Sequence, residues 1–416
     1  MVNENLEGKR WFIALAGVII MLTLGTVYAW SVFVKPIVAA QGWEMKVVSR
    51  VFMLIIGVIG ISAAFGGILV DKKGPKFVAT LGTCFYGAGV LLGGIALYIG
   101  NFWFLLFGYG LIAGIGNGLA YVVPIATLIR WFPDKRGLIT GLAVMGFGFG
   151  AFFIGLIAPG LINKVGVASA FIVLGAVYLV LSVSASLTLK NPPAGWLPKG
   201  FTPASTTVSA ADSFSWAEAH KTRQWYMLWV MLFLNVTAGM GLLSKLSPMA
   251  QEVIKFAQNI DDPAKLAVLG GSVLATASIF NGLGRLFWAA VSDKIGRKGV
   301  YMVMFLTQAV LYILLPQVTS VLVFTIIACY LLACLGGGFA VMPAFAADSF
   351  GPTYIGKVYG FLLTAWGAAG VVGGFVFAQF DKQQSLYTAA ACLVIGFFVA
   401  LLFKRPEHVS HYRTTK

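Results

Sequence analysis

Long apolar stretches alternate with short polar segments along the whole chain. About twelve of the apolar stretches have 18 or more residues, which lets a helix cross a hydrocarbon core of about 30 Å. The pattern predicts an all-α integral membrane protein with twelve transmembrane helices. The expected spans are 11–38, 47–70, 77–99, 102–130, 138–162, 167–189, 225–250, 266–292, 299–315, 321–350, 358–380 and 386–403.

One polar segment is much longer than the others and separates six predicted spans from the other six. It covers about residues 190–224 and is rich in Pro, Ser, Thr and Ala. Within it, Ser215-Trp216-Ala217-Glu218 is typical of the start of a short helix. The predicted organisation is an N-terminal six-helix half (1–189), a linker (190–224), a C-terminal six-helix half (225–404) and a tail (405–416).

Three motifs occur once in each half, at an offset of 219 to 222 residues. Such an internal repeat predicts two pseudo-symmetric six-helix bundles, the architecture of transporters whose halves rock about a central site. The pairs are Asp71 and Gly74 with Asp293 and Gly296, the glycine-rich segment 116–124 with 336–343, and Gly137 and Gly141 with Gly356 and Gly360.

The distribution of positive charge predicts the orientation. The 416 residues are 59% hydrophobic and 10% charged, with a net charge of +15. Twenty of the 29 Lys and Arg residues fall on the side of both termini, eight on the opposite side, and Arg285 within a span. By the positive-inside rule, both termini, the linker and the tail are expected in the cytoplasm, with the protein in the cytoplasmic (inner) membrane. The charge therefore indicates topology rather than nucleic-acid binding.

The sequence has no arrangement of residues typical of a catalytic or metal-binding site. The four cysteines lie in apolar stretches without a CxxC pair, and the three histidines lie in predicted cytoplasmic segments. The sequence has no metal-ligand spacing and no phosphate-binding loop for ATP. We expect no enzyme activity, no cofactor and no metal, and therefore transport driven by a solute or ion gradient. The segment 1–10 lacks the features of a signal peptide, so the first span is expected to be retained.

Arg285 is a charged residue inside a predicted transmembrane helix. It precedes Asp293 by eight residues, about 12 Å along a helix, which is beyond comfortable snorkelling. A guanidinium stays charged and binds a carboxylate through two parallel hydrogen bonds. Arg285 is therefore the candidate binding residue for an organic anion. Asn281 lies one turn earlier, and it either orients the guanidinium and contacts substrate or joins neighbouring helices.

Other polar and aromatic residues are candidates for the lining of the same cavity. In the N-terminal half these are Tyr28, Asn117 and Tyr121, which lie beside glycines that let helices approach. In the C-terminal half Tyr359 and Trp366 lie two turns apart on one face, and Asn235 is a weaker candidate. Each of them could instead serve packing, and Trp366 could face lipid.

Charged residues at the predicted cytoplasmic helix ends are candidates for gates. We expect Asp71 to bond the helix that follows its own turn and to pair with Arg130. Asp293, Arg297 and Asp348 are the counterparts in the C-terminal half. Ion pairs that form in one state and break in another would bias alternating access, whereas static surface pairs would contribute about 0–1 kcal/mol.

The motifs around these residues resemble those of the major facilitator superfamily over the whole chain. The loop motif is Gly67-x-Leu69-x-Asp71-x-x-Gly74-x-Lys76, with a degenerate copy at 289–298. The chain is similar to the oxalate/formate antiporter family and the related monocarboxylate porters in Arg-Trp-Phe-Pro-Asp-Lys-Arg-Gly-Leu at 130–138, Asn-Gly-x-Gly-Arg at 281–285 and Val-Tyr-Gly-Phe at 358–361. The resemblance implies the major facilitator fold and a substrate-binding arginine at Arg285.

Two departures from these families refine the expected substrate. Asn281 stands where animal-type monocarboxylate porters have an aspartate, which removes an obvious proton carrier. Trp366 stands where the oxalate/formate antiporter is expected to carry a second cation, a lysine. A single cation suits a monoanion better than a dianion.

We therefore expect a secondary active transporter of small monocarboxylates such as lactate or pyruvate, coupled to protons by symport and working by alternating access around Arg285. The expected partners are a small organic anion, protons and the lipid bilayer, and the protein is expected to be a monomer. The alternative is a carboxylate exchanger of the oxalate/formate type. A membrane-embedded sensor or acyl-handling enzyme is disfavoured because neither linker nor tail has a signalling domain or an active site.

Overall fold

The computed structural model describes residues 2–193, 195–201 and 213–406. These residues form helices joined by short loops, with no strand among them. Twelve helices of this described part are long and apolar enough to cross a membrane. The predicted number of spans and the all-α fold class are confirmed.

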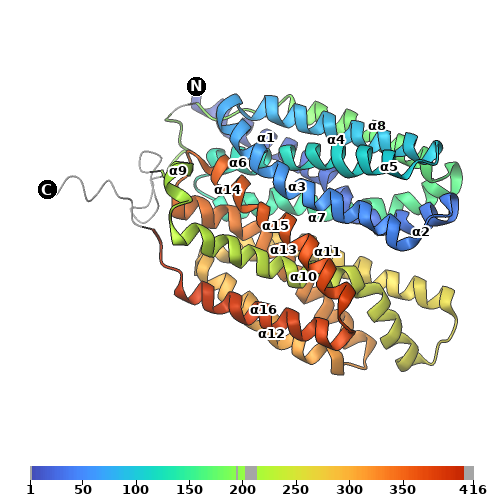
Figure 1. The fold of residues 1–416 in the computed structure, drawn as a ribbon. Helices are drawn as coiled ribbons and strands as arrows, with labels where there is room; N and C mark the ends of the chain where they lie inside the picture. The colour runs from blue at the N-terminus through green and yellow to red at the C-terminus, as the bar shows by residue number, and fades with distance from the viewer. Residues whose placement is uncertain (1, 194, 202–212, 407–416) are drawn as a thin grey trace.

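The helices gather into two bundles that lie side by side (Figure 1). The first contains α1 (Val2–Gly25), η1 (Thr26–Ala29), α2 (Trp30–Gln41), α3 (Met45–Lys73), α4 (Pro75–Tyr98), α5 (Phe102–Leu105), η2 (Leu106–Ala113), α6 (Gly114–Trp131), α7 (Arg136–Val165) and α8 (Val167–Ser186). The second contains α10 (Arg223–Gln258), α11 (Pro263–Ile295), α12 (Arg297–Leu314), η3 (Leu315–Gln317), α13 (Val321–Phe350), α14 (Ile355–Leu362), α15 (Thr364–Gln379) and α16 (Lys382–Leu402).

In its described part, the segment between the bundles contains one short helix, α9 (Trp216–Ala219). It begins as predicted, because the Ser215 and Glu218 side chains form a capping box with the backbone. The rest of the predicted linker at 202–212 and the tail at 407–416 lie outside the described residues, and the domain boundaries at 189 and 225 stay predictions. The start of α1 and the end of α16 lie at the same end of the bundles as α9 (Figure 1). We call this the terminal end.

Three spans are interrupted, which the hydrophobic pattern did not predict. The first passes through a 3-10 turn, η1, and the fourth through a π-helix, η2. The eleventh breaks between α14 and α15. At the first break the hydroxyls of Thr23 and Thr26 donate hydrogen bonds to backbone carbonyls three residues earlier, at 2.7 Å each. Such bonds compete with the regular helical pattern, and apolar composition does not report them.

The bundles meet along two seams, one between α3 and the α14–α15 pair and one between α7 and α11. Glycines allow the helix backbones to approach closely in both seams. A Cβ atom added to Gly60 would lie 2.5 Å from the Cα of Gly367, and one added to Gly148 would lie 2.8 Å from the Cα of Gly282. Backbones can touch there only because the side chains are missing.

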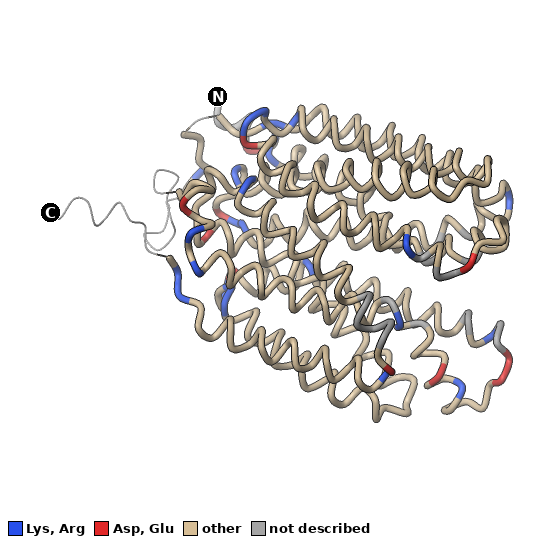
Figure 2. The backbone as a smooth tube through the Cα atoms, in the orientation of Figure 1, with Lys and Arg blue, Asp and Glu red and all other residues tan. Residues whose placement is uncertain are grey.

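Charged residues gather near the two ends of the bundles and are sparse between them (Figure 2). Among the side chains that the structure describes, the buried charged ones are Arg10 and Arg285. Arg10 forms ion pairs with Glu7 at 2.9 Å and Asp134 at 3.1 Å. Arg285 is 1% exposed. Unlike Arg10, it donates its hydrogen bonds to neutral groups.

Candidate functional site

Arg285 lies on α11 and its guanidinium is held by neutral groups. Nε donates to Oδ1 of Asn281 at 3.1 Å, and Nη1 donates to the backbone carbonyl of Val144 on α7 at 3.1 Å. The remaining nitrogen, Nη2, is buried without a hydrogen-bond partner. The guanidinium carbon also lies 5.5 Å from the ring centres of Phe147 and Phe339. In the described part of the chain, none of these contacts is a carboxylate.

Asn281 contacts Arg285 as its position one helical turn earlier predicts. Its side-chain oxygen accepts from the guanidinium, which corresponds to the orienting alternative of the two that the sequence left open. Both residues lie on α11 opposite Gly336 of α13, where an added Cβ atom would lie 2.9 Å from Cγ of Arg285. The glycine thus leaves room for the arginine side chain between the two helices.

Trp366 on α15 lies at the centre of an aromatic cluster and is fully buried, so it does not face lipid. The ring centres around it are 5.1 Å away for Tyr121, 6.1 Å for Tyr28, 5.6 Å for Phe147 and 5.3 Å for Phe339. With Trp366 itself, three rings of the cluster come from the first bundle and two from the second. The cluster therefore joins the two halves at the level of Arg285.

Several polar atoms around this cluster are buried without a partner. Apart from Nη2 of Arg285, they are the hydroxyls of Tyr28, Tyr121 and Tyr359 and the indole nitrogen of Trp366. All three tyrosines lie within electrostatic reach of the guanidinium. Buried polar groups are almost always hydrogen-bonded, and leaving one unpaired costs about 1–3 kcal/mol. A group with several acceptor atoms is the complement of this arrangement.

The electrostatics of the site favour an anion. The guanidinium is charged at any physiological pH, and a buried charge without a counter-ion is strongly disfavoured. Burial also strengthens attraction for an opposite charge, since the local dielectric constant is lower than that of water. The charge and the unpaired donors together suit an anion with several acceptor atoms.

Two of the asparagines considered from the sequence lie in other surroundings. The amide of Asn117 donates to the carbonyl of Leu24 at 2.9 Å, next to the break in the first span. Asn235 accepts a hydrogen bond from Gln308 at 3.1 Å. Both hydrogen bonds join helices within one bundle. The structure thus brings Arg285, Asn281 and the aromatic residues together, but gives Asn117 no contact with the guanidinium.

Phe147 and Phe339 complete the site and were not among the sequence candidates. Phe147 lies in the run Gly-Phe-Gly-Phe-Gly at 146–150, and Phe339 follows the three glycines at 336–338. A large aromatic side chain flanked by glycines on an apolar helix is the signal that could have identified both. Glycines at those positions let neighbouring helices close around the ring.

At the terminal end, Asp71 connects the two bundles. One of its carboxylate oxygens accepts from Arg130 at 2.8 Å, and the other accepts from the backbone nitrogen of Lys357 at 2.7 Å. Arg130 also donates to the carbonyl of Thr353 at 3.0 Å. The predicted Asp71–Arg130 pair is confirmed. The predicted bond to the helix after its own turn is wrong, since Asp71 caps α14 of the opposite bundle instead.

Asp293 forms the equivalent connection in the opposite direction. Its two oxygens accept from the backbone nitrogens of Gly137 at 3.2 Å and Leu138 at 3.0 Å, at the start of α7. A carboxylate there also complements the positive end of the helix dipole. The motif repeat in the sequence therefore corresponds to a repeat in space, in which an aspartate of each half caps a helix of the other.

Arginines on both sides complete this end. Arg297 pairs with Asp293 at 2.6 Å and with Asp348 at 3.0 Å. Arg136, which the sequence analysis did not select, pairs with Asp348 at 3.2 Å and links the bundles once more. The predicted carboxylate–arginine contacts therefore exist in this structure, and they hold the two bundles together at the terminal end.

Comparisons with known proteins agree with this architecture. The model of the Major Facilitator Superfamily matches residues 13–374 and 267–416, so the chain belongs to that superfamily. It is a multi-pass membrane carrier and not an enzyme.

Individual relatives extend along most of the chain. The oxalate:formate antiporter of Oxalobacter formigenes is 30% identical over 96% of this chain and 91% of its own length. Apicoplast pyruvate carrier 1 of Toxoplasma gondii is 26% identical over 81% of this chain and 70% of its own. Among solved structures, the proton:xylose symporter XylE has a similar fold, with a TM-score of 0.70, 15% identity and coverage of 98% and 99%. The chain is therefore a carrier of the oxalate:formate antiporter and monocarboxylate transporter type.

Proposed function

We propose that this carrier moves small monocarboxylates, such as lactate or pyruvate, across the cytoplasmic membrane by alternating access around Arg285. The observation that carries the proposal is the set of unpaired polar atoms around one uncompensated guanidinium. A carboxylate supplies the negative charge and the acceptor atoms that this set needs. The aromatic rings suit a short apolar remainder rather than a second charged group.

The substrate class follows from the number of charges. Among the described residues, Arg285 is the one cation in contact with the aromatic cluster. Trp366 occupies the position at which a second cation would allow the site to neutralise a dianion. A monocarboxylate neutralises the site, whereas a dicarboxylate leaves one negative charge in an apolar environment. The names of the pyruvate carrier and the oxalate:formate antiporter agree with a short carboxylate substrate.

We favour proton symport because a proton and a monoanion together carry no net charge through the membrane. Among the described residues, none of the groups in contact with Arg285 is a carboxylate, so the substrate carboxylate itself is the candidate proton carrier. Carboxylate exchange is the second candidate, favoured by the 30% identity with the oxalate:formate antiporter.

The two aspartate caps and their arginines would form the gate. In this proposal, Asp71 with Arg130, and Asp293 with Arg297 and Asp348, hold the terminal end closed and release it when the halves rock. The Lys and Arg distribution supports a cytoplasmic terminal end. We propose that the protein acts as a monomer, because the site is assembled from the two halves of one chain.

Transport by purified protein in proteoliposomes tests these proposals. Labelled lactate or pyruvate should accumulate under an inward proton gradient, and a protonophore should abolish the accumulation. Exchange of preloaded formate for external oxalate that a protonophore leaves unaffected would support the antiporter instead. If neither experiment showed flux for any short carboxylate, the proposed substrate class would be wrong.

A further inference from the structure

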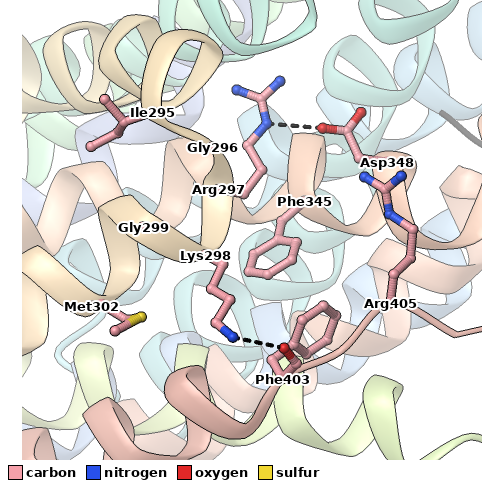
Figure 3. Close-up of a pocket in the computed structure, with 10 residues that line it drawn as sticks. All are labelled: Ile295, Gly296, Arg297, Lys298, Gly299, Met302, Phe345, Asp348, Phe403 and Arg405. Carbon is pink, nitrogen blue, oxygen red and sulfur yellow. Dashed lines mark hydrogen bonds and ion pairs between the residues drawn. The ribbon is translucent and has the colours of Figure 1, made fainter. Parts of the chain in front are cut away.

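A groove of about 470 Å³ lies at the terminal end of the second bundle, away from Arg285. It is formed by the turn between α11 and α12, by α13, and by the chain that leaves α16. Figure 3 shows three basic side chains around it, Arg297, Lys298 and Arg405. Arg297 and Asp348 of its lining also belong to the proposed gate, whereas Lys298 and Arg405 do not.

Positive charge is in excess in this groove. Asp348 is the acidic residue among those that line it, and both of its oxygens are engaged, one by Arg136 and the other by Arg297. Lys298 donates to the carbonyls of Leu401 at 2.8 Å and Phe403 at 3.0 Å (Figure 3). Since carbonyls carry no net charge, they do not neutralise the ammonium of Lys298, which forms no ion pair within the described part of the chain.

The inner wall of the groove is apolar. Phe345 and Phe403 pack edge to face with ring centres 4.8 Å apart, and Met302 lies beside them. The helices α12 and α16 extend from the groove and pack against each other. Both carry exposed apolar side chains, which are Leu306 and Val310 on α12 and Ile395, Phe398 and Leu402 on α16. The groove therefore has a basic rim at the end of an apolar surface.

The start of α12 adds to the positive potential. The N-cap of this helix is Gly296, whose backbone has a φ of 82° and which provides no side-chain cap for the first turn. The first amides of an uncapped helix attract anions, because they carry the positive end of the helix dipole. They lie beside Arg297 and Lys298, at the lining of the groove.

We propose that this groove binds the headgroup phosphate of an anionic phospholipid, whose acyl chains lie along the exposed apolar faces of α12 and α16. The phosphate would lie between Lys298, Arg405 and the start of α12. A basic pocket between transmembrane helices is suited to anionic headgroups. A zwitterionic lipid fits less well, because its ammonium group would lie among basic side chains and Asp348 is already shared by Arg136 and Arg297.

Native mass spectrometry of the full-length protein tests this proposal. Equal amounts of phosphatidylglycerol and phosphatidylethanolamine are added to the purified protein, and the retained lipid is identified. We expect phosphatidylglycerol to be retained in preference. Lys298→Gln and Arg405→Gln should each weaken its binding about fivefold, the effect of one basic residue near a lipid surface.

The internal repeat offers a matched control. Lys76 occupies the position of Lys298 in the first bundle, so Lys76→Gln removes the same charge at the same end. It should leave lipid retention unchanged, and Lys298→Arg should restore it. Arg405→Gln gives an independent test if Lys298→Gln disturbs the end of α16.

Three outcomes would overturn the proposal. The first is equal retention of phosphatidylethanolamine, and the second is an equal loss of phosphatidylglycerol binding in Lys76→Gln. The third is displacement of the lipid by soluble glycerol phosphate at similar concentration, which would identify a site for a free phosphate group rather than for a lipid.

Discussion

The aromatic cluster around Arg285 and the ion pairs at the terminal end both join the two bundles. They differ in whether their polar groups have hydrogen-bond partners. In the cluster, five polar atoms, including Nη2 of Arg285, are buried without partners. At the terminal end, each oxygen of Asp71 and of Asp293 accepts a hydrogen bond.

In the proposed function, this difference separates the binding of substrate from the closing of the gate. A region whose polar groups satisfy one another is stable without any ligand, as a closed gate must be. A region with unpaired donors gains stability only when another molecule supplies the acceptors. Substitutions in the cluster should therefore change transport more than folding, and substitutions at the terminal end should change the balance between conformations.

The largest expected effect is that of Arg285→Ala. Without the guanidinium, a carboxylate has no counter-charge in an apolar site, so transport should fall by about 100-fold or more. Arg285→Lys should also retain little transport, because an ammonium lacks the planar fork of donors. Uptake of labelled lactate or pyruvate into proteoliposomes measures both.

Stability separates this loss from misfolding. Arg285 is a buried charge without a counter-ion, so Arg285→Ala should unfold at the same temperature as the wild type or higher in the absence of substrate. Wild-type transport in Arg285→Ala would refute the central role of this residue.

Trp366→Lys should change the preferred substrate. A second cation beside Arg285 neutralises a second carboxylate, so the ratio of dicarboxylate to monocarboxylate transport should rise by about tenfold or more. Competition by a panel of short mono- and dicarboxylates measures this ratio. Trp366→Met is the control, because a methionine side chain is similar in length to that of lysine but neutral. It should weaken transport without changing the preference for mono- or dicarboxylates. An unchanged ratio in Trp366→Lys would contradict the proposal that the number of cations in the site determines the charge of the preferred substrate.

Asp71→Asn and Asp293→Asn should open the terminal end. A hydrogen bond to a charged group contributes about 1.5–3 kcal/mol, so each change should shift the population of the closed state by about tenfold or more, and the double variant further. Distances between spin labels at the exposed Lys72 and Lys294 report the opening.

Glu252→Gln is the matched control for this experiment. It removes the ion pair with Lys382 at 2.8 Å, whose side chains are 63% and 35% exposed. Exposed pairs contribute little, so the distance between the labels should not change. Equal distances in all variants would mean that the aspartate caps are static contacts.

The sequence was sufficient for those parts of the molecule that depend on local spacing. Twelve apolar stretches gave the spans, and the one-turn separation of Asn281 and Arg285 gave their contact. The pairing of Asp71 with Arg130 was predicted because both residues lie at predicted cytoplasmic ends of spans. In these cases the signal is the spacing along one helix or the position at a span end, so the detailed packing of the helices was not needed.

Other parts depend on how the bundles meet and could not be predicted in this way. Asp71 binds the backbone of Lys357, which is 286 residues away, and only the docking of α3 against α14 determines this. Phe147 and Phe339 look like ordinary apolar residues until α7, α11 and α13 enclose the guanidinium. The break after Gly25 reflects local hydrogen bonds of threonines, to which a hydropathy pattern is insensitive.

The smallest expected effect gives the sharpest test of the comparison, because two equally buried tyrosines differ in whether their hydroxyl has a hydrogen-bond partner. The Tyr121 hydroxyl has no partner, whereas that of Tyr301 donates to the carbonyl of Gly338 at 2.6 Å. If substrate completes the site, Tyr121→Phe should raise KM about fivefold, the effect of one hydrogen bond, without lowering thermal stability.

Tyr301→Phe should show the reverse. It leaves the Gly338 carbonyl without this donor, so the melting temperature should fall while KM stays near the wild-type value. Transport kinetics and thermal unfolding of the two variants, measured side by side, test whether unpaired groups serve the ligand and paired groups serve the fold. A loss of stability without a change in KM for Tyr121→Phe would place that hydroxyl among the structural groups and remove it from the binding site.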